Sequence, residues 1–396
     1  MQQHKFIFVY GFALFAMFFG SGNLVFPLQV GQATGQSWML GYLGLFITGI
    51  ILPFLGLMVI KLYKGSYLAF FGEAGSLMKY VLPLFTLSLL GSFGVVPRCI
   101  TVAHGSLYDL CPNFSLFSFS LLFSALTFFL SLREGRMLRI IGKWLSPVKL
   151  GALLILIGVA FLIAPDSTTQ AVPHTALTNG FLAGYQTMDL FAAFFFSALI
   201  FGQIEKSLPE TMSHKEVMKA AIKPSIVGAS LIALVYFGFV YLGAHYADLI
   251  AGVSPALYLP ILAKQTMGSV GTWFVAFVMP LSCLTTAVAL NNIYARYLCS
   301  LMKMGENKFP LILLGTTSIS FVMSLLDFKG IAAFLAPALE VSYPGIIALT
   351  VMCLMTQKHK GLKIGLFYAI SLAMGGVVVF VDEVHMKKLS SLARRP

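Results

Sequence analysis

An apolar run near the N-terminus, residues 6–30, is long enough to cross a bilayer as a helix, yet its middle has the sequence GSGN at residues 20–23, followed by Pro27. Glycine weakens a helix, and proline removes a backbone N–H and clashes with the preceding turn. We therefore expect the helix to break there. In hydrocarbon such a break is tolerated only where it faces protein, water or a ligand.

A broken transmembrane helix also has a specific chemical use. The carbonyl groups that end its first half suit a cation, and the N–H groups that begin its second half suit an anion such as a carboxylate. This is the arrangement of a transport site. The other interpretation is a kink that serves only close helix packing.

Composition indicates that the chain lies in a membrane. It has 396 residues, of which 58% are hydrophobic and only 10% are charged, against about 25% charged residues in soluble domains. Eleven apolar runs of spanning length lie near residues 6–30, 38–60, 80–107, 114–132, 144–164, 180–203, 225–246, 269–298, 309–326, 330–355 and 362–382. The sequence thus predicts an all-α polytopic protein of about eleven transmembrane helices, with the lipid bilayer as its surroundings.

The net charge of +12 does not indicate a nucleic-acid partner, because the basic residues gather in short loops on one side of the predicted spans. With a cytoplasmic N-terminus, the inner loops carry basic clusters, whereas the outer loops carry only Lys264 and Lys329. This bias predicts the orientation of the protein. The basic tail after residue 386 would lie outside, so we expect either a further span or a tail on the membrane surface.

A second irregular stretch, residues 180–189, has the sequence GFLAGYQTMD at the start of the sixth run. If the spans form two halves, residues 1–164 and 165–355, the first span of each half is interrupted. Paired interruptions of this kind are the best indication in a sequence of a transport site built at an inverted repeat. Residues 356–396 then form the last span and a short tail.

Arg98, Glu340 and Lys149 are charged residues within the predicted spans, where a charge is expensive and by default marks a functional site. Arg98 follows Pro97 in the third run, and Glu340 lies between two prolines in the tenth. Arg98 either serves the site or bonds to carbonyls that Pro97 frees. Glu340 couples transport to a proton or ion, forms a salt bridge to Arg98, or anchors a break in its helix. Lys149 lies near a span end, where we expect it to extend to the interface.

Ser282, Thr285 and Thr286 lie close together in the eighth run. Hydroxyl side chains in a helix often bond back to the carbonyl one turn earlier. They also supply the oxygen ligands that a Na⁺ ion needs, facing the carbonyls that the first broken span releases.

Other functional classes lack their motifs. The chain contains no G-x-x-x-x-G-K-[ST] motif of a nucleotide-driven pump, and no H-E-x-x-H, C-x-x-C or G-x-S-x-G motif. The five cysteines have no paired spacing and suit packing better than a disulfide or metal site. We expect a transporter and no enzyme; an enzyme acting on lipid-linked substrates and a passive channel are the weaker alternatives.

Five motifs in order resemble the bacterial branched-chain amino acid:cation symporters, the BrnQ-type carriers of the amino acid-polyamine-cation superfamily. They are residues 19–27, Pro97-Arg98, residues 184–189, residues 283–286 and residues 339–344. The resemblance implies a LeuT-like fold, in which spans 1–5 and 6–10 form an inverted repeat and spans 1 and 6 are unwound. Members of the family usually have twelve spans, one more than we expect here.

The resemblance also implies roles for individual residues. The substrate carboxylate would be held at the N–H groups around Gly20, Ser21, Gly22 and Asn23. The ammonium group would be received near Tyr185, Thr187 and Asp189. A Na⁺ site would be formed by the carbonyls of Ala16, Phe19 and Ser282 and the hydroxyls of Thr285 and Thr286.

By this resemblance the chain is a secondary active symporter of a bacterial inner membrane that imports Leu, Ile or Val, and Met in related carriers, coupled to Na⁺. Proton coupling through Asp189 or Glu340 is the nearest alternative. The sequence does not determine the oligomeric state.

Overall fold

The computed structural model describes residues 2–132, 146–167, 173–206, 214–356 and 358–392, and within these ranges the chain is helical and contains no strand. The first half contains α1 (Gln2–Phe18), α2 (Ser21–Thr34), η1 (Gly35–Ser37), α3 (Trp38–Phe46), η2 (Ile47–Ile51), α4 (Leu52–Leu62), α5 (Tyr67–Phe71), η3 (Gly72–Ala74), α6 (Met78–Leu90), α7 (Val95–Gly105), α8 (Leu116–Ser131) and α10 (Ser146–Leu162). The second half contains α11 (Pro173–Thr187), α12 (Asp189–Lys206), α13 (His214–His245), η5 (Pro255–Leu257), α14 (Tyr258–Leu301), η6 (Glu306–Lys308), α15 (Phe309–Ser324), α16 (Asp327–Met355) and α17 (Lys360–Leu392).

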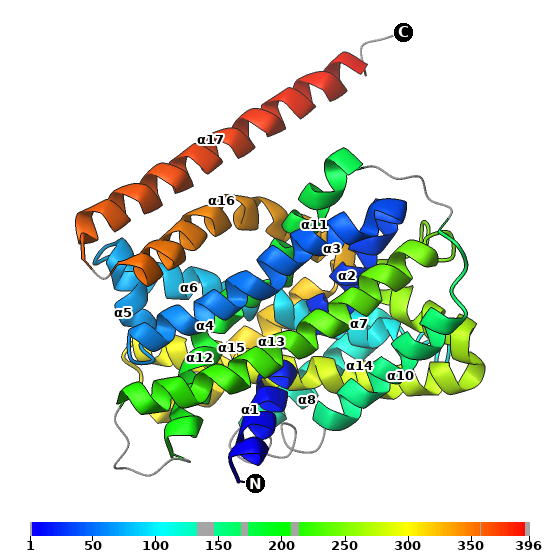
Figure 1. Cartoon of the computed structure of the whole chain (residues 1–396), viewed down its shortest axis with the longest axis horizontal. Helices are drawn as coiled ribbons and strands as arrows, with labels where there is room; N and C mark the ends of the chain where they lie inside the picture. The colour runs from blue at the N-terminus through cyan, green and yellow to red at the C-terminus, as the bar shows by residue number, and fades with distance from the viewer. Residues whose placement is uncertain (1, 133–145, 168–172, 207–213, 357, 393–396) are drawn as a thin grey trace.

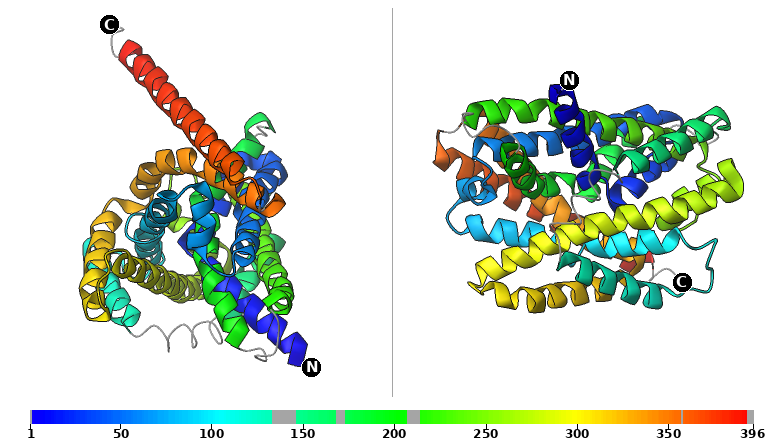
Figure 2. Two further views of the ribbon diagram at one scale, coloured as in Figure 1. Left: turned by 90° about the vertical axis from the view of Figure 1, so that its left-hand side faces the viewer. Right: turned by 90° about the horizontal axis from the view of Figure 1, so that it is seen from below.

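Most of the long helices run alongside one another as a bundle (Figures 1 and 2). Among the described residues, five helices are long and apolar enough to cross a membrane, or six when the bent pair α11 and α12 counts as one span. Each of the predicted apolar runs coincides with one helix or with a broken pair. The all-α prediction is therefore confirmed, while the count of eleven spans stays a prediction.

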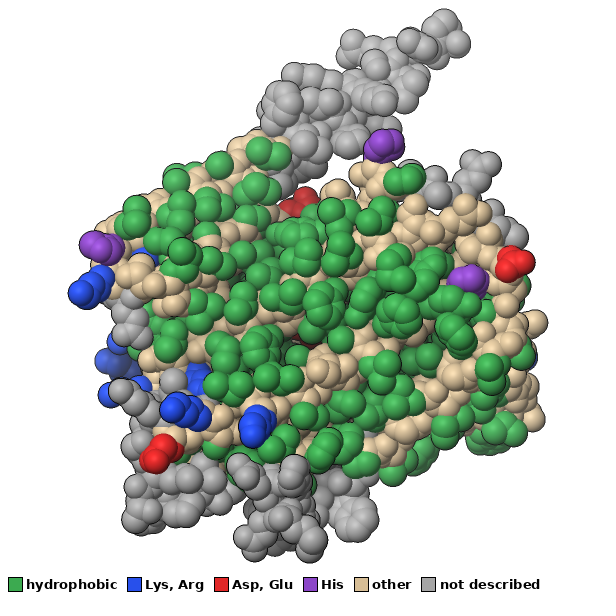
Figure 3. Space-filling model, viewed as in Figure 1, with side chains coloured by type: hydrophobic (Ala, Val, Ile, Leu, Met, Phe, Trp, Pro, Cys, Tyr) green, Lys and Arg blue, Asp and Glu red, His purple; other side chains and the backbone are tan. Residues whose placement is uncertain are grey.

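The surface of the bundle matches a membrane environment. Hydrophobic side chains cover the middle of the face in Figure 3, and Lys and Arg gather toward the left-hand end, where Figure 1 places α5. Large apolar side chains are exposed on several helices, including Leu122 and Phe129 of α8 and Trp273 of α14. Lipid chains can cover such side chains, whereas soluble proteins rarely expose a large apolar patch to water.

The first predicted break is confirmed and is shorter than the sequence suggested. Helix α1 ends at Phe18 and α2 begins at Ser21, so that only Phe19 and Gly20 lie between them. Pro27 lies inside α2. The break is short because Asn23 caps it: its side-chain oxygen accepts a hydrogen bond from the Gly20 N–H at 3.0 Å.

The second predicted break is also confirmed and consists of one residue. Met188 separates α11 from α12 and has φ +59°, a conformation that non-glycine residues rarely adopt. The two helices are bent by 41° at this point.

Two further irregularities were not predicted. Residues 91–94 interrupt the third span between α6 and α7, and η2 inserts a π-helical segment into the second span. Such segments often occur at functional sites. The interruption in the third span sets the position of Arg98, which lies in the first turn of α7.

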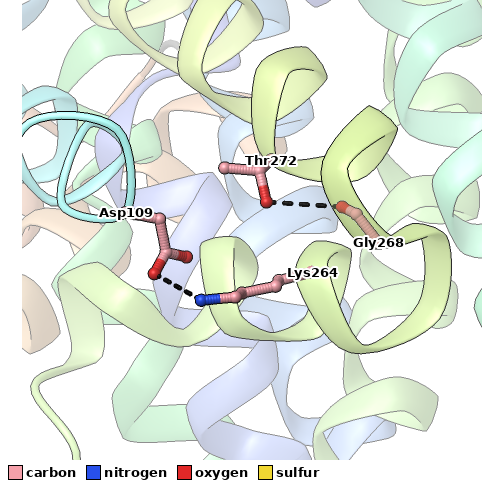
Figure 4. A network of polar contacts seen from close by, with 4 residues as sticks. All are labelled: Asp109, Lys264, Gly268 and Thr272. Atoms are coloured by element: carbon pink, nitrogen blue, oxygen red, sulfur yellow. Dashed lines mark hydrogen bonds and ion pairs between the residues drawn. The ribbon is translucent and has the colours of Figure 1, made fainter.

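Helix α14 contains a bend near its N-terminal end. Gly268 has φ +59° inside the helix, and the Thr272 hydroxyl donates to the Gly268 carbonyl at 3.3 Å (Figure 4). Just before the bend, the Lys264 ammonium pairs with Asp109 at 2.8 Å. This ion pair ties the short segment before Gly268 to the loop that follows α7.

Helix α17 lies outside the rest of the bundle. It begins against α16 and then extends away, so that its far end lies apart from the other helices (Figures 1 and 2). Near its start, the buried Lys363 ammonium pairs with Glu73 of η3 at 2.8 Å. The last helix therefore adds no residue to the region of the two breaks.

Candidate functional site

The two breaks lie directly against each other. Gly22, in the first turn of α2, is so close to α11 that a Cβ added there would lie 3.3 Å from Thr187 Cα. Gly20 faces α14, because an added Cβ would lie 3.0 Å from Thr286 Cγ2. A side chain at either position would be tightly packed, which favours the two glycines of the GSGN sequence.

A buried hydrogen-bond network connects the breaks. The Asn23 amide nitrogen donates to Asp189 Oδ2 at 2.8 Å and also bonds the Tyr236 hydroxyl. The Tyr236 hydroxyl donates to the same Asp189 oxygen at 2.9 Å. Asn23 and Asp189 are 2% and 3% exposed and Tyr236 is fully buried, so the network is shielded from solvent.

This network refines the predicted roles of three residues. Asn23 and Asp189, which were expected to contact the substrate separately, bind each other across the two breaks. The Thr187 hydroxyl donates to the Gly184 carbonyl at 2.8 Å and lies 3.4 Å from the Asp189 N–H. Thr187 therefore caps the start of α12. The two broken helices are therefore held together by polar contacts.

Lys149 of α10 reaches the end of the first half of the broken span. Its ammonium donates to the Phe19 carbonyl at 3.0 Å and to the Ser282 hydroxyl oxygen at 3.0 Å. The Ser282 hydroxyl donates to the same Phe19 carbonyl at 3.0 Å. The rings of Phe15 and Phe19 lie 5.5 Å and 5.1 Å from the ammonium, within the range of cation–π attraction.

The expectation that Lys149 extends to the membrane interface is wrong. Its side chain turns inward and the residue is only 7% exposed. A cation in the interior needs oxygen partners, and a carbonyl released by a helix break is one of the few available there. The position of Lys149 in an apolar run was the sequence signal for this contact.

The residues expected to bind Na⁺ are thus partly assembled around an ammonium group. Phe19 and Ser282 contact Lys149, as described. The hydroxyls of Thr285 and Thr286 donate to the Ser282 carbonyl at 2.7 Å and 3.3 Å. These are hydrogen bonds to the preceding turn of the same helix, the alternative to Na⁺ binding that the sequence left open. Ala16 is buried in α1, and no side chain among the described residues donates to its carbonyl.

A cavity of about 350 Å³ lies beside the breaks between α2, α11 and α16, at the lower end of the size range of ligand pockets. Its lining combines apolar and polar side chains, including Phe26, Leu182, Leu339, Gln29, Gln186 and Glu340. Tyr185, a predicted substrate residue, also lines it. The cavity lies on the membrane side opposite the N-terminus, because α2 and α11 are the distal halves of the broken spans.

The two charged residues considered together from the sequence do not pair. Glu340 lines the cavity and is half-buried. Arg98 is 1% exposed and donates to the Gln186 carbonyl at 2.7 Å. Among the described residues no ion pair joins Arg98 to Glu340, so the salt-bridge interpretation of Glu340 is wrong.

Tyr236 of α13 is the component that sequence reasoning missed entirely. It is one of 15 tyrosines in an aromatic-rich chain, and nothing in its sequence neighbourhood distinguishes it. Only the packing of α13 against α2 and α12 brings its hydroxyl to Asp189.

A model of the family described as "Branched-chain amino acid transport protein" matches residues 3–394 of the chain. The branched-chain amino acid transport system 3 carrier protein of Pseudomonas aeruginosa is 32% identical over 351 residues, which cover 86% of this chain and 79% of that protein. Branched-chain amino acid permease BraB of Bacillus subtilis is 28% identical, covering 89% of this chain and 80% of the relative. Permease BrnQ of Haemophilus influenzae is 29% identical, covering 92% and 84%.

Solved structures with similar folds are more distant in sequence. A manganese transporter of Eremococcus coleocola superposes with a TM-score of 0.65 at 13% identity, covering 95% of this chain and 86% of that chain. The inward-facing conformation of Mhp1 gives a TM-score of 0.57 at 14% identity, covering 86% and 75%. These likenesses confirm the LeuT-like fold, with its broken first and sixth spans.

Proposed function

The chain belongs to the family of branched-chain amino acid transport proteins, and from this premise we propose that it is a symporter that imports Leu, Ile or Val by alternating access, driven by a cation gradient. The observation that carries the proposal is the contact between the two broken spans, where Asn23 bonds Asp189. Related carriers are named for the same substrates. Methionine is a further substrate that the apolar lining would admit.

The positions of two cavities support a path for the substrate through the breaks. The cavity of about 350 Å³ lies on the distal side of the breaks, and a smaller one of about 150 Å³ lies near Lys61 and Glu205 on the other side. With the N-terminus in the cytoplasm of a bacterial inner membrane, the larger cavity faces outward. A substrate would enter there, and separation of the broken spans would open the path to the smaller cavity.

Two candidates for the driving cation differ in what occupies the position between Phe19 and Ser282. Na⁺ coupling, expected from the family resemblance, requires the Lys149 ammonium to leave, since two unit charges about 4 Å apart repel by about 4 kcal/mol at an effective dielectric of 20. In the second candidate, Lys149 is a resident cation and protons drive uptake. The two 3.0 Å contacts of the ammonium favour the second candidate.

Uptake of labelled isoleucine into proteoliposomes tests the function. The purified protein is reconstituted with an inward Na⁺ gradient, an inward proton gradient, or neither, at equal membrane potential. We expect accumulation under at least one gradient, and competition by unlabelled leucine and valine. Accumulation only with Na⁺ would select the first candidate, and accumulation with protons alone the second. No accumulation of any branched-chain amino acid under either gradient would overturn the proposal.

A further inference from the structure

Arg98 is a buried cation whose hydrogen-bonding capacity is mostly unused. It is 1% exposed, and Nη1 donates to the Gln186 carbonyl at 2.7 Å. Nε and Nη2 are both buried and have no partner among the described residues. A buried charge without compensation is strongly unfavourable, and each unpaired buried donor adds to the cost. A single carbonyl acceptor does not compensate the buried charge of an arginine that has only a structural role.

No carboxylate of the described chain compensates Arg98. Asp189, the buried carboxylate of the breaks, is bonded by Asn23 and Tyr236. Glu340 forms no ion pair with the guanidinium. Lys149 adds a second buried cation to the same region. Arg98 therefore has no carboxylate partner among the described residues, and an anionic group of a ligand can take that place.

The surroundings of the guanidinium show where such a group would come from. The Phe26 ring lies 5.3 Å from the guanidinium carbon, and Phe26 and Gln186 both line the cavity of about 350 Å³. Arg98 thus contacts two residues of the cavity lining, the Phe26 ring and the Gln186 backbone carbonyl. The Gln186 side-chain oxygen and the nearby Tyr343 hydroxyl are also buried without a partner. Several polar atoms here are therefore free to form hydrogen bonds with a ligand.

The first turn of α2 faces the same position. Cys99, the residue after Arg98, donates its thiol to the Ser21 hydroxyl at 3.4 Å. The first N–H groups of a helix have no acceptor within the helix and attract negative charge. Arg98 and the start of α2 therefore both favour an anion, and they lie on two helices that are in contact.

We propose that Arg98 binds the α-carboxylate of the transported amino acid. The inference rests on the proposed function and names the residue that recognises its substrate class. The carboxylate enters from the cavity as Phe26 and Gln186 move aside, and it accepts from Nε and Nη2, the fork geometry that suits an arginine–carboxylate pair. The first-turn N–H groups of α2 assist, and the aliphatic side chain stays in the apolar part of the cavity.

Equilibrium binding to the purified full-length protein tests this role. Isothermal titration calorimetry compares L-isoleucine with 2-methylbutylamine, which is isoleucine without its carboxylate. For the wild-type chain we expect isoleucine to bind at least about 30-fold more tightly than 2-methylbutylamine. This factor is the lower end of the loss in affinity that follows when one partner of a buried charge pair is removed. Arg98→Gln should lose about that factor for isoleucine and leave binding of the amine unchanged.

Two further variants make the result interpretable. Arg98→Lys keeps the positive charge but lacks the two parallel N–H donors of the guanidinium, so it should fold even if Arg98→Gln does not. It should bind isoleucine about tenfold more weakly than the wild type. Lys363→Gln removes another buried cation, far from the breaks and paired with Glu73, and should bind both compounds like the wild type.

The outcomes separate the two proposals. If the wild-type chain binds no branched-chain amino acid, the proposed function fails and the role of Arg98 with it. If the wild type binds isoleucine and a folded Arg98 variant, lysine or glutamine, binds it with the same affinity and the same preference over the amine, the role of Arg98 alone is overturned.

Discussion

At the scale of single residues, the Lys149 ammonium lies where the sequence predicted a Na⁺ site. Lys149 contacts the carbonyl that the first break releases and the hydroxyl that was expected to bind Na⁺. The sequence indicated a charge in this span and a cation site nearby. It did not show that the two coincide, because the direction of a lysine side chain depends on the packing of α10 against α1 and α14.

Replacement of Lys149 by alanine should change the response to Na⁺. The substitution removes the charge and leaves space between Phe19 and Ser282. We expect isoleucine binding by the wild-type protein to be insensitive to Na⁺, and binding by Lys149→Ala to tighten at least severalfold when NaCl replaces choline chloride. Binding that requires Na⁺ in the wild-type protein and is lost in the variant would show instead that Lys149 serves a Na⁺ site.

Removal of the Tyr236 hydroxyl should destabilise the fold. In Tyr236→Phe, Asp189 loses one of two donors to Oδ2, and a hydrogen bond to a charged group contributes about 1.5–3 kcal/mol. We expect a lower unfolding temperature in detergent and slower isoleucine uptake. Tyr294→Phe is the matched control, since no hydrogen bond of its hydroxyl occurs among the described residues, and it should melt like the wild type. Equal unfolding temperatures for the two variants would contradict a stabilising role of the hydrogen bonds among Asn23, Asp189 and Tyr236.

At the scale of helices, glycine sets how closely the two halves approach. A Cβ added at Gly180 of α11 would overlap the Gly41 carbonyl oxygen of α3, and one at Gly44 would overlap the Leu177 carbonyl oxygen. Small residues allow such contacts between backbones, which drive association of helices in membranes where no hydrophobic effect operates. The contact fixes α11 next to α3 and so positions the second break.

Gly180→Ala should therefore be costly. An added methyl group forces α11 away from α3, and overpacking of this kind costs about 1–3 kcal/mol or more. Gly158→Ala in α10 is the matched control, because an added Cβ there meets no atom within 4 Å and alanine favours a helix over glycine by about 1 kcal/mol. We expect the first variant to unfold at lower temperature and the second to equal or exceed the wild type. The opposite order would contradict the close packing.

At the scale of the whole molecule, the breaks lie between two cavities in a bundle with an apolar surface and one basic end (Figure 3). The fold is that of carriers with 11–14% sequence identity to this chain, so it follows from the pattern of spans and breaks more than from individual residues. The orientation in the membrane is the part of the arrangement that charge alone predicts.

Chemical labelling of a native cysteine tests the predicted orientation in the membrane. Cys111 is exposed and lies next to Asp109 at the distal end of the bundle, whereas Cys99, Cys283, Cys299 and Cys353 are buried. We expect a membrane-impermeant maleimide to label Cys111 in intact cells. Cys111→Ser should abolish the label, and Lys64→Cys in that background should react only after permeabilisation. Labelling of residue 64 in intact cells would show that the N-terminus lies outside.

The sequence alone determined the features that depend on neighbouring residues. Apolar runs predicted the helical spans. Glycines predicted both breaks, together with Pro27 at the first and a polar cluster at the second, and the motifs predicted the family. Tertiary structure alone decided the partners: Asn23 with Asp189 and Tyr236, Lys149 with Phe19 and Ser282, and Arg98 with almost nothing. These contacts join residues far apart in the chain, and a rotation of one helix would remove them without changing its hydropathy.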